Sequence, residues 1–403
     1  MPDQPATASP LSKDPRLAWK MGMAVSCRLV LNIARRFAYP FAPALSRGLG
    51  VPLTAITSLI AVNQATAILG ILFGPVADRL GYRLMMLAGL TMLTVGMFAG
   101  GLLPFYSVVL VALFLAGLGK SVFDPAIQAY VSERVPYQRR GLAIGFLEFS
   151  WAGSTLVGIP LLGLLIDGFG WRAPFFTLGG LGLIGIFILK VLIPKDGKKA
   201  TTRNVSSMGF WNIWKQLGKE RTALGAVGFS FFISAANDNL FVVYGAWLEK
   251  SFALSIVALG LGTSVIGFAE LSGESLTAVL ADRFGLKRSV ILGLVLCLMS
   301  YGLLPIFGQA LAPAFGGLFM IFLIFEFTIV SFLSLCTELL PASRATMMSG
   351  FFAAAGIGRI VGALIGGPVW LAGGIHATGY VSSSISGMAL VSLVWGLKGW
   401  RQS

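Results

Sequence analysis

The sequence predicts an all-α membrane protein in which twelve transmembrane helices form two related halves of six. Three observations predict this fold class. Of the 403 residues, 56% are hydrophobic and only 11% are charged, which is more apolar surface than a water-soluble core can bury. The apolar residues are gathered in long segments, and a loop motif of the first half returns in the second.

The apolar segments each contain about twenty residues, enough to cross roughly 30 Å of hydrocarbon as a helix. Six belong to each half of the chain, near residues 21–45, 54–76, 84–104, 106–130, 141–166, 172–193, 222–247, 255–279, 289–308, 312–337, 345–371 and 378–398. A chain of this kind is expected to fold as helices, because only helices and closed barrels satisfy every backbone polar group inside a bilayer.

A loop motif between the second and third segments returns between the eighth and ninth. The first copy comprises Gly74, Asp78, Arg79, Gly81 and Arg83. The second copy lies 204 residues later and comprises Asp282, Arg283, Gly285 and Lys287. A further pair, Glu133 and Glu338, is separated by 205 residues. Two sets of residues that recur at nearly one offset indicate that the two halves are related.

The basic residues predict the orientation of the chain in its membrane. Most of the 30 Lys and Arg residues lie in loops on the same side as both termini, and only Arg47, Arg172 and Lys250 lie in loops on the other side. Because cytoplasmic loops are rich in Lys and Arg, we expect a bacterial-type plasma membrane with both termini in the cytoplasm. The expected units are a cytoplasmic tail (1–20), a six-helix bundle (21–193), a basic cytoplasmic linker (194–221) and a second six-helix bundle (222–403).

Composition and motifs argue against several other classes of protein. The formal net charge is +14, but the basic residues lie in short loops and not on one polar domain, so no nucleic-acid partner is expected. There is no Gly-x-x-x-x-Gly-Lys loop and His376 is the single histidine, so we do not expect an enzyme. The separated Cys27, Cys297 and Cys336 predict no metal site, and no cofactor is expected. The expected partners are the lipid bilayer and a small-molecule solute, with the chain as a monomer.

Polar residues inside the predicted helices indicate a transport pathway, because an ionisable group in a membrane helix normally faces a cavity or a partner. In the first helix, one polar stripe at three- and four-residue steps contains Arg28, Asn32, Arg35, Arg36 and Tyr39. The offset of 204 residues maps Arg35 to the level of the seventh helix at which Asn237 and Asp238 lie. We therefore expect a substrate cavity between the halves at this depth.

Other helices add ionisable residues to the expected pathway. Glu270 and Glu274 lie one turn apart on the eighth helix, and two carboxylates so placed repel when both are ionised, so at least one is expected to hold a proton near neutral pH. The remaining candidates are Lys120, Asp124, Glu148, Glu326 and Arg359. For several of them the alternative is a buried structural pair, such as Lys120 with Asp124.

The repeated loop motif predicts a conformational gate. A carboxylate at a helix end, such as Asp78 or Asp282, can cap a neighbouring helix N-terminus and interact with its dipole. The expected ion pairs are Arg79 and Arg83 with Glu133, and Arg283 and Lys287 with Glu338. Such contacts would hold the halves together on the inner face. The alternative is that the loops serve only solubility and topology.

This combination of residues resembles a known family. The motif from Gly74 to Arg83, its weaker copy at Asp282 and the twelve segments are similar to the major facilitator superfamily over essentially the full chain. The resemblance implies that family's fold of two six-helix bundles and transport by alternating access. It also implies that Asp78 faces the eleventh helix and that Asp282 faces the fifth.

The fifth and sixth helices narrow the resemblance to the branch of drug and sugar efflux proton antiporters. Gly158, Pro160 and Gly163 resemble, with one extra residue, the Gly-Pro motif of that branch, and the stretch 171–176 is similar to the start of its sixth helix. One departure concerns the proton-coupling arginine of such proteins, since the equivalent position is Leu113. Lys120, two turns further along, is the expected substitute for its charge.

We expect a secondary active transporter driven by the proton gradient. The first hypothesis is proton-coupled efflux of a small organic or amphiphilic solute, with the proton on Asp238, Glu270, Glu274 or Glu148. The second is proton-coupled uptake of an organic anion, bound by Arg35, Arg36 and Arg359. A third, from another class, is a lipid flippase or a non-transporting membrane partner.

Overall fold

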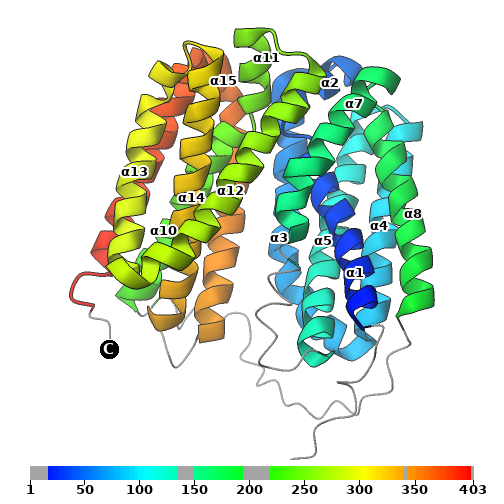
Figure 1. Ribbon diagram of the computed structural model, residues 1–403, viewed down its shortest axis with the longest axis horizontal. Helices are drawn as coiled ribbons and strands as arrows, with labels where there is room; N and C mark the ends of the chain where they lie inside the picture. Colours follow the sequence, from blue (N-terminus) through cyan, green and yellow to red (C-terminus); the bar gives the residue numbers. More distant parts are fainter. Residues whose placement is uncertain are drawn as a thin grey trace, which may run out of the picture.

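The computed structural model describes residues 17–134, 147, 149–193, 218, 220–339 and 344–400. Figure 1 shows two helical bundles side by side, the first coloured blue to green and the second green to red. The described residues are almost entirely helical and contain no strand. The predicted all-α fold class is confirmed.

The first bundle contains α1 (Leu17–Arg36), α2 (Ala42–Leu49), α3 (Leu53–Leu80), α4 (Tyr82–Leu102), α5 (Tyr106–Arg134), the π-helix η3 (Ser154–Gly158), α7 (Ile159–Phe169) and α8 (Ala173–Leu192). The second contains α10 (Arg221–Phe241), α11 (Tyr244–Phe252), α12 (Ile256–Phe284), α13 (Leu286–Phe307), α14 (Leu311–Leu339) and α15 (Arg344–Gly396). We call the end at which α8 ends and α10 begins the linker end. The opposite end, which carries α2 and α11, is the far end (Figure 1).

The predicted number of membrane crossings agrees with the helices. Ten stretches of the described residues are long and apolar enough to span a bilayer. The helix α1 is not among them, because Lys20, Arg28, Arg35 and Arg36 lower its hydropathy. The helix α15 is counted as one of the ten membrane-spanning stretches, although Gly373 and Gly374 interrupt its helical backbone. With α1 added and α15 taken as two helices, the crossings are the predicted twelve.

The first helix of each bundle is broken, whereas the segments 21–45 and 222–247 were predicted to be continuous. The helix α1 ends at Arg36, and a turn that contains Pro40 leads to α2. Proline lacks an amide proton and clashes with the preceding helical turn, so it favours such a break. In the second bundle, α10 ends at Phe241 and α11 begins at Tyr244. The two breaks lie at equivalent positions of the related halves.

The two broken helices meet at the far end. A Cβ atom on Gly245 of α11 would lie 2.3 Å from the carbonyl oxygen of Pro40, so only glycine permits this approach of two backbones. An ion pair of 2.7 Å between Arg47 of α2 and Glu249 of α11 also joins the bundles here. Packing of α7 on α12 and of α3 on α15 extends the interface. The far end is therefore closed.

The glycine of each loop motif makes a tight helix-to-helix turn at the linker end. Gly81 has a φ of 96° between α3 and α4, and Gly285 has a φ of 81° between α12 and α13. Residues with a Cβ rarely adopt such angles, so glycine is needed for these turns. The repeat of the motif in sequence is therefore also a repeat of backbone geometry.

The basic residue that follows each of these turns binds the end of the last helix of its own bundle. Arg83 donates a hydrogen bond of 2.6 Å to the carbonyl of Lys190 in the last turn of α8. Lys287 donates to the carbonyls of Leu397 and Trp400, at 3.1 and 3.2 Å, just after α15. Helix C-termini carry unsatisfied carbonyls and partial negative charge, which explains the preference for a cation.

We expect Gly245→Ala to destabilise the protein by about 1–3 kcal/mol, because the new methyl group would push against the backbone at Pro40. Thermal unfolding of the detergent-purified chain measures the effect as a fall in apparent Tm. The matched control is Gly180→Ala in α8, where a Cβ would meet no atom within 4 Å. Equal apparent Tm values for the two variants would contradict the close packing of the broken helices.

Candidate functional site

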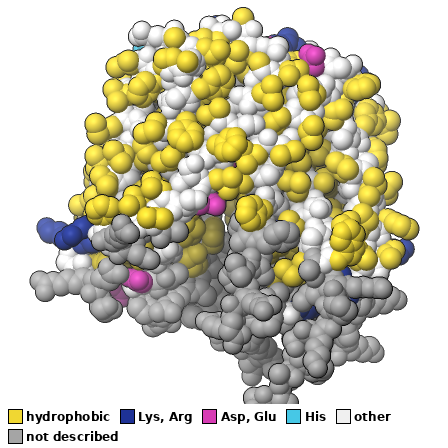
Figure 2. Space-filling model, in the orientation of Figure 1, with side chains coloured by type: hydrophobic (Ala, Val, Ile, Leu, Met, Phe, Trp, Pro, Cys, Tyr) yellow, Lys and Arg dark blue, Asp and Glu magenta, His cyan; other side chains and the backbone are white. Residues whose placement is uncertain are grey.

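A cavity of about 1370 Å³ lies between the two bundles. Residues of α1, α3 and α5 line it from the first bundle, and residues of α10, α12, α14 and α15 line it from the second. It extends from Tyr39 and Phe241, beside the helix breaks, toward Gln128 and Leu333, which are nearer the linker end. Figure 2 shows the surface hollowed between the bundles on that side. Because the far end is closed, the cavity is expected to exchange solutes through the linker end.

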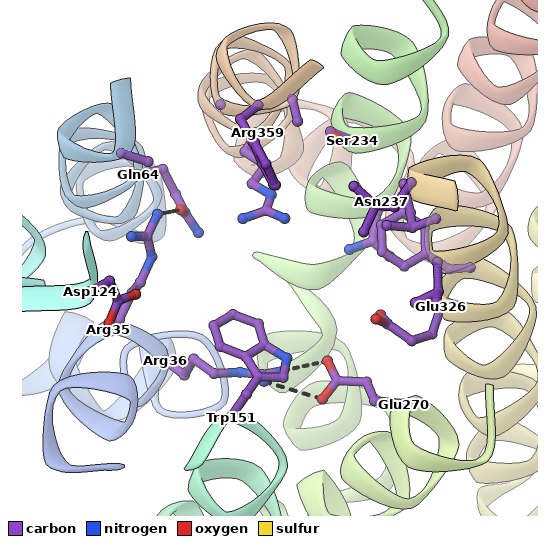
Figure 3. A pocket seen from close by; sticks show the side chains of 18 of the residues that line it. Arg35, Arg36, Gln64, Asp124, Trp151, Ser234, Asn237, Glu270, Glu326 and Arg359 are labelled. Carbon is purple, nitrogen blue, oxygen red and sulfur yellow. Dashed lines mark hydrogen bonds and ion pairs between the residues drawn. The ribbon is translucent and has the colours of Figure 1, made fainter. Parts of the chain in front are cut away.

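A buried ion pair joins the two bundles across this cavity. Two nitrogens of Arg36 on α1 contact the two carboxylate oxygens of Glu270 on α12, at 2.6 and 3.2 Å (Figure 3). Their side chains are only 4% and 7% exposed. The Arg36 guanidinium also lies 4.2 Å from the ring centre of Trp151. Such a paired arrangement compensates two charges that would be costly to bury alone.

A chain of hydrogen bonds crosses between the bundles at the same depth. Arg35 donates to the side-chain carbonyl of Gln64, and the Gln64 amide donates to the Tyr39 hydroxyl. Tyr39 in turn donates to the carboxylate of Asp238 on α10 at 3.0 Å. The polar residues beside both helix breaks are thus part of one network.

A cluster of three charged side chains, Arg28, Lys120 and Asp124, lies within the first bundle. Asp124 accepts from Arg28 at 3.1 Å and from Lys120 at 2.5 Å, the latter one helical turn away on α5. Lys120 and Asp124 therefore do form the pair that was considered as the structural alternative. All three side chains nevertheless line the cavity. Their arrangement leaves two cations around one carboxylate.

Two charged residues of the second bundle face the cavity without a direct partner. Among the described residues, neither the side chain of Glu326 on α14 nor that of Arg359 on α15 makes a hydrogen bond or an ion pair. Figure 3 shows both side chains projecting toward the open space of the pocket. Since charges inside a membrane protein normally have a partner, these two are the strongest candidates to contact a solute or a proton.

The structure brings most of the predicted pathway residues together. The predicted residues that line the cavity are Arg35, Arg36, Lys120, Asp124, Asn237, Asp238, Glu270, Glu274, Glu326 and Arg359. Asn32 is not in the wall, because its amide donates to Ser150 within the first bundle at 3.1 Å. Glu148 lies outside the described residues. No group of three or more His, Cys, Asp or Glu side chains in the described part of the chain is placed to hold a metal ion.

The predicted gate residues are only partly described. The structure gives the helical backbone but not the side chains of Gly74, Asp78, Arg79, Glu133, Asp282 and Arg283. The expected pairing of Lys287 with Glu338 is wrong, because the contacts of Lys287 are the carbonyls that follow α15. Arg83 binds a carbonyl of its own bundle. The contacts described for these two cations therefore stabilise each bundle.

Two further residues of the site, Gln64 and Trp151, were not predicted from the sequence. Gln64 and Tyr39 link Arg35 to Asp238, and Trp151 covers the guanidinium of Arg36. Gln64 had a detectable signal, since it is a polar residue inside an apolar segment. Tyr39 belongs to the polar stripe of the first helix. The position of Trp151 could not be deduced from spacing, because it depends on how two helices are rotated toward each other.

Two bundles of apolar helices around a charged cavity define a membrane transporter. The chain belongs to the Major Facilitator Superfamily, whose family model matches residues 24–236. The MFS-type transporter YceJ of Bacillus subtilis is 26% identical over 301 residues, which are 75% of this chain and 76% of YceJ. The multidrug resistance protein MdtG of Escherichia coli is 26% identical over 304 residues, which are 71% of this chain and 72% of MdtG.

Solved structures agree on the fold. The nucleoside transporter NupG has a TM-score of 0.77 at 16% identity, with 95% of this chain and 100% of the NupG chain covered. A bacterial homologue of the human lysosomal transporter Spinster, in an inward-facing conformation, has a TM-score of 0.75 at 15% identity. The alignment covers 97% of this chain and 100% of that homologue. At such identities the likeness shows the fold alone.

We predict that Arg36 and Glu270 are strongly coupled in a double-mutant cycle made with Arg36→Gln and Glu270→Gln. Each single change should destabilise the protein by about 3–5 kcal/mol, because it leaves a buried charge without its partner. The double change should cost less than the sum, with a coupling energy of at least about 1.5 kcal/mol.

Equilibrium unfolding in detergent measures this cycle. The control cycle uses Arg47 and Glu249, where Arg47 is 59% exposed, and its coupling should be only about 0.2–1 kcal/mol. Additive effects of the Arg36 and Glu270 changes would contradict a bridging role for the pair.

Proposed function

We propose that the protein is a proton-coupled exporter of a small organic or amphiphilic solute, which works by alternating access. The observation that carries the proposal is Glu326, a carboxylate that faces the cavity with no direct partner among the described residues. A carboxylate in this position can hold either a proton or the positive charge of a solute. Competition between the two at one group would couple proton entry to solute exit.

The charges around Glu326 support this role. The charged groups that act on it are Glu270, Glu274, Arg36 and Arg359. Three carboxylates placed so close repel each other when all are ionised, and a single proton shared among them removes part of that repulsion. A proton that reaches Glu270 would also weaken the bridge to Arg36 and so favour separation of the bundles. Proton binding would thus act on both the solute and the conformation.

The orientation of the chain supports export from the cytoplasm. In the proposed orientation the linker end is cytoplasmic, because most of the basic residues lie in the loops at that end. The cavity, closed at the far end, would then receive solute from the cytoplasm. Opening of the far end would let the solute leave and let an external proton enter. The proton gradient is the proposed energy source, and no cofactor is involved.

The relatives support efflux over uptake. MdtG carries the name of a multidrug resistance protein. A homologue of the multi-drug resistance efflux pump PmrA from Lactococcus lactis is 23% identical over 293 residues, which are 70% of this chain and 72% of that pump. Proton-coupled uptake of an organic anion is the second candidate. The observation that favours it is Arg359, which faces the cavity and has no direct partner in the described part of the chain.

We expect a C-terminal green fluorescent protein fusion to fluoresce and a C-terminal alkaline phosphatase fusion to be inactive in a bacterial host. The reason is that a cytoplasmic C-terminus permits folding of the first reporter and prevents oxidative folding of the second. The opposite pattern would place the linker end outside. It would also reverse the direction in which the cavity is open.

We predict that Glu326→Gln abolishes accumulation driven by a proton gradient and leaves solute exchange without a gradient measurable. The glutamine keeps the size of the side chain but cannot take up a proton, so coupling is lost while the pathway remains. The assay is proteoliposomes with an imposed pH gradient, an internal pH dye, and a panel of cationic, anionic, zwitterionic and neutral solutes. The control is Asp167→Asn, an exposed carboxylate of α7 outside the cavity.

The same vesicles distinguish the two candidate functions. For an exporter, a proton flux into the compartment from which solute leaves accelerates movement, whereas for symport the proton and solute move together. If no solute moves and no proton flux follows, the transporter proposal fails in this form. If Glu326→Gln retains full gradient-driven accumulation, Glu326 is not the proton carrier.

A further inference from the structure

The charges of the cavity are sorted between its two walls. Among the described residues, the first bundle contributes four cations and one carboxylate, namely Arg28, Arg35, Arg36, Lys120 and Asp124. The second bundle contributes four carboxylates and one cation, namely Asp238, Glu270, Glu274, Glu326 and Arg359. With every group ionised, the two walls carry opposite and equal net charges. For these described groups, only a solute without net charge would leave the sum of charges at zero.

One part of the cavity is suited to an anionic group. Arg35 and Arg359 come from opposite bundles and act on each other as like charges. The side-chain hydrogen bond described for Arg35 goes to the neutral Gln64, and Arg359 has no direct partner among the described residues. Figure 3 shows the Arg359 guanidinium directed into the pocket and the Arg35 guanidinium at its edge, beside Gln64. A carboxylate or phosphonate between them would relieve their repulsion and match their planar donors.

Another part of the cavity is suited to a cationic group. Glu326 is near Glu270 and Glu274, and the bidentate contact of Arg36 goes to Glu270, so Glu326 itself has no direct partner among the described residues. Figure 3 shows Glu326 and Glu270 on the side of the pocket away from Arg35. An ammonium group beside Glu326 would compensate the excess negative charge of this wall. The anionic and cationic subsites therefore belong to different regions of one cavity.

Aromatic side chains line the cavity together with these charges. They include Tyr39, Trp151, Phe241 and Phe322. The rings of Tyr39 and Phe241 lie 4.3 Å apart, and those of Phe241 and Phe322 lie 5.2 Å apart. Flat aromatic surfaces of this kind bind apolar bodies and tolerate variation in their shape.

We infer that the exported solute is an amphiphilic zwitterion, with an anionic group held by Arg35 and Arg359, an ammonium group held by Glu326, and an apolar body against the aromatic side chains. The inference rests on the proposed function and narrows its solute class. A purely cationic solute would give Arg359 no direct anionic partner and would leave the repulsion between the two arginines in place. A purely anionic solute would give Glu326 no direct cationic partner. A zwitterion satisfies both groups in a single bound state.

Binding to the full-length, detergent-purified protein near neutral pH tests this inference with three probes of one shape. They are 4-(aminomethyl)benzoate, which has both charges, benzylamine, which has only the ammonium group, and benzoate, which has only the carboxylate. We expect titration calorimetry to show that the zwitterion binds at least about tenfold more tightly than either other probe. Equal affinity of a singly charged probe, or no binding of the zwitterion, would overturn the inference.

Two variants assign the charges of the probe to the two subsites. Arg359→Gln should weaken the zwitterion about tenfold, to the level of benzylamine, and leave benzylamine itself unaffected. Glu326→Gln should weaken the zwitterion to the level of benzoate and leave benzoate unaffected. The matched controls are Arg172→Gln and Asp167→Asn, which alter exposed residues outside the cavity. An equal loss for all three probes in either cavity variant would show a structural effect and overturn the assignment.

A flux experiment separates failure of this inference from failure of the proposed function. Neutral benzylamine crosses lipid unaided, so benzyltrimethylammonium is the cationic probe in proteoliposomes. If a proton gradient drives this cation but not the zwitterion, export stands and the zwitterion inference fails. If the zwitterion binds selectively but no gradient moves any probe, the solute class stands and proton-coupled export fails.

Discussion

The ion pair between Arg36 and Glu270 is the interaction on which the arrangement of this protein depends. Both side chains are almost fully buried, and each comes from a different bundle. Neither charge can lose the other without a large desolvation cost, so α1 and α12 are held at a fixed separation. That separation sets the width of the cavity and the positions of its other charges. The network from Arg35 to Asp238 adds a second cross-link at the same level.

The sequence predicted the architecture well because hydropathy and internal repetition are properties of the chain that need no tertiary information. Segment length follows from bilayer thickness, and the Asp78 and Asp282 motifs revealed the relation between the halves. The breaks after Arg36 and Phe241 were not predicted, because short interruptions do not change the hydropathy of a twenty-residue window. Pro40 was the local sign of the first break, whereas no proline marks the second.

The site was predictable as a set of residues but not as a set of contacts. The described charged residues in the interior of the predicted segments line the cavity, since the cost of burying charge in lipid leaves few other places for it. Arg172, Lys190 and Lys398 lie at the ends of their segments and do not line it. Spacing places Asn32 and Arg35 on one helix stripe, yet Asn32 binds Ser150 in its own bundle. The partner of a residue depends on how helices are rotated and tilted against one another. This explains why Glu270 was recognised, but its pairing with Arg36 was not.

The contact of Gly245 with Pro40 makes the opening of the far end a switch with two positions. A backbone has no rotamers, so this contact cannot relax gradually as contacts between flexible side chains do. The two backbone segments at this point are either in contact or separated. An intermediate separation would leave a void that neither lipid nor protein fills. Such geometry creates an activation barrier between two discrete states. It would keep both ends from being open at once and so limit the leak of protons through an empty carrier.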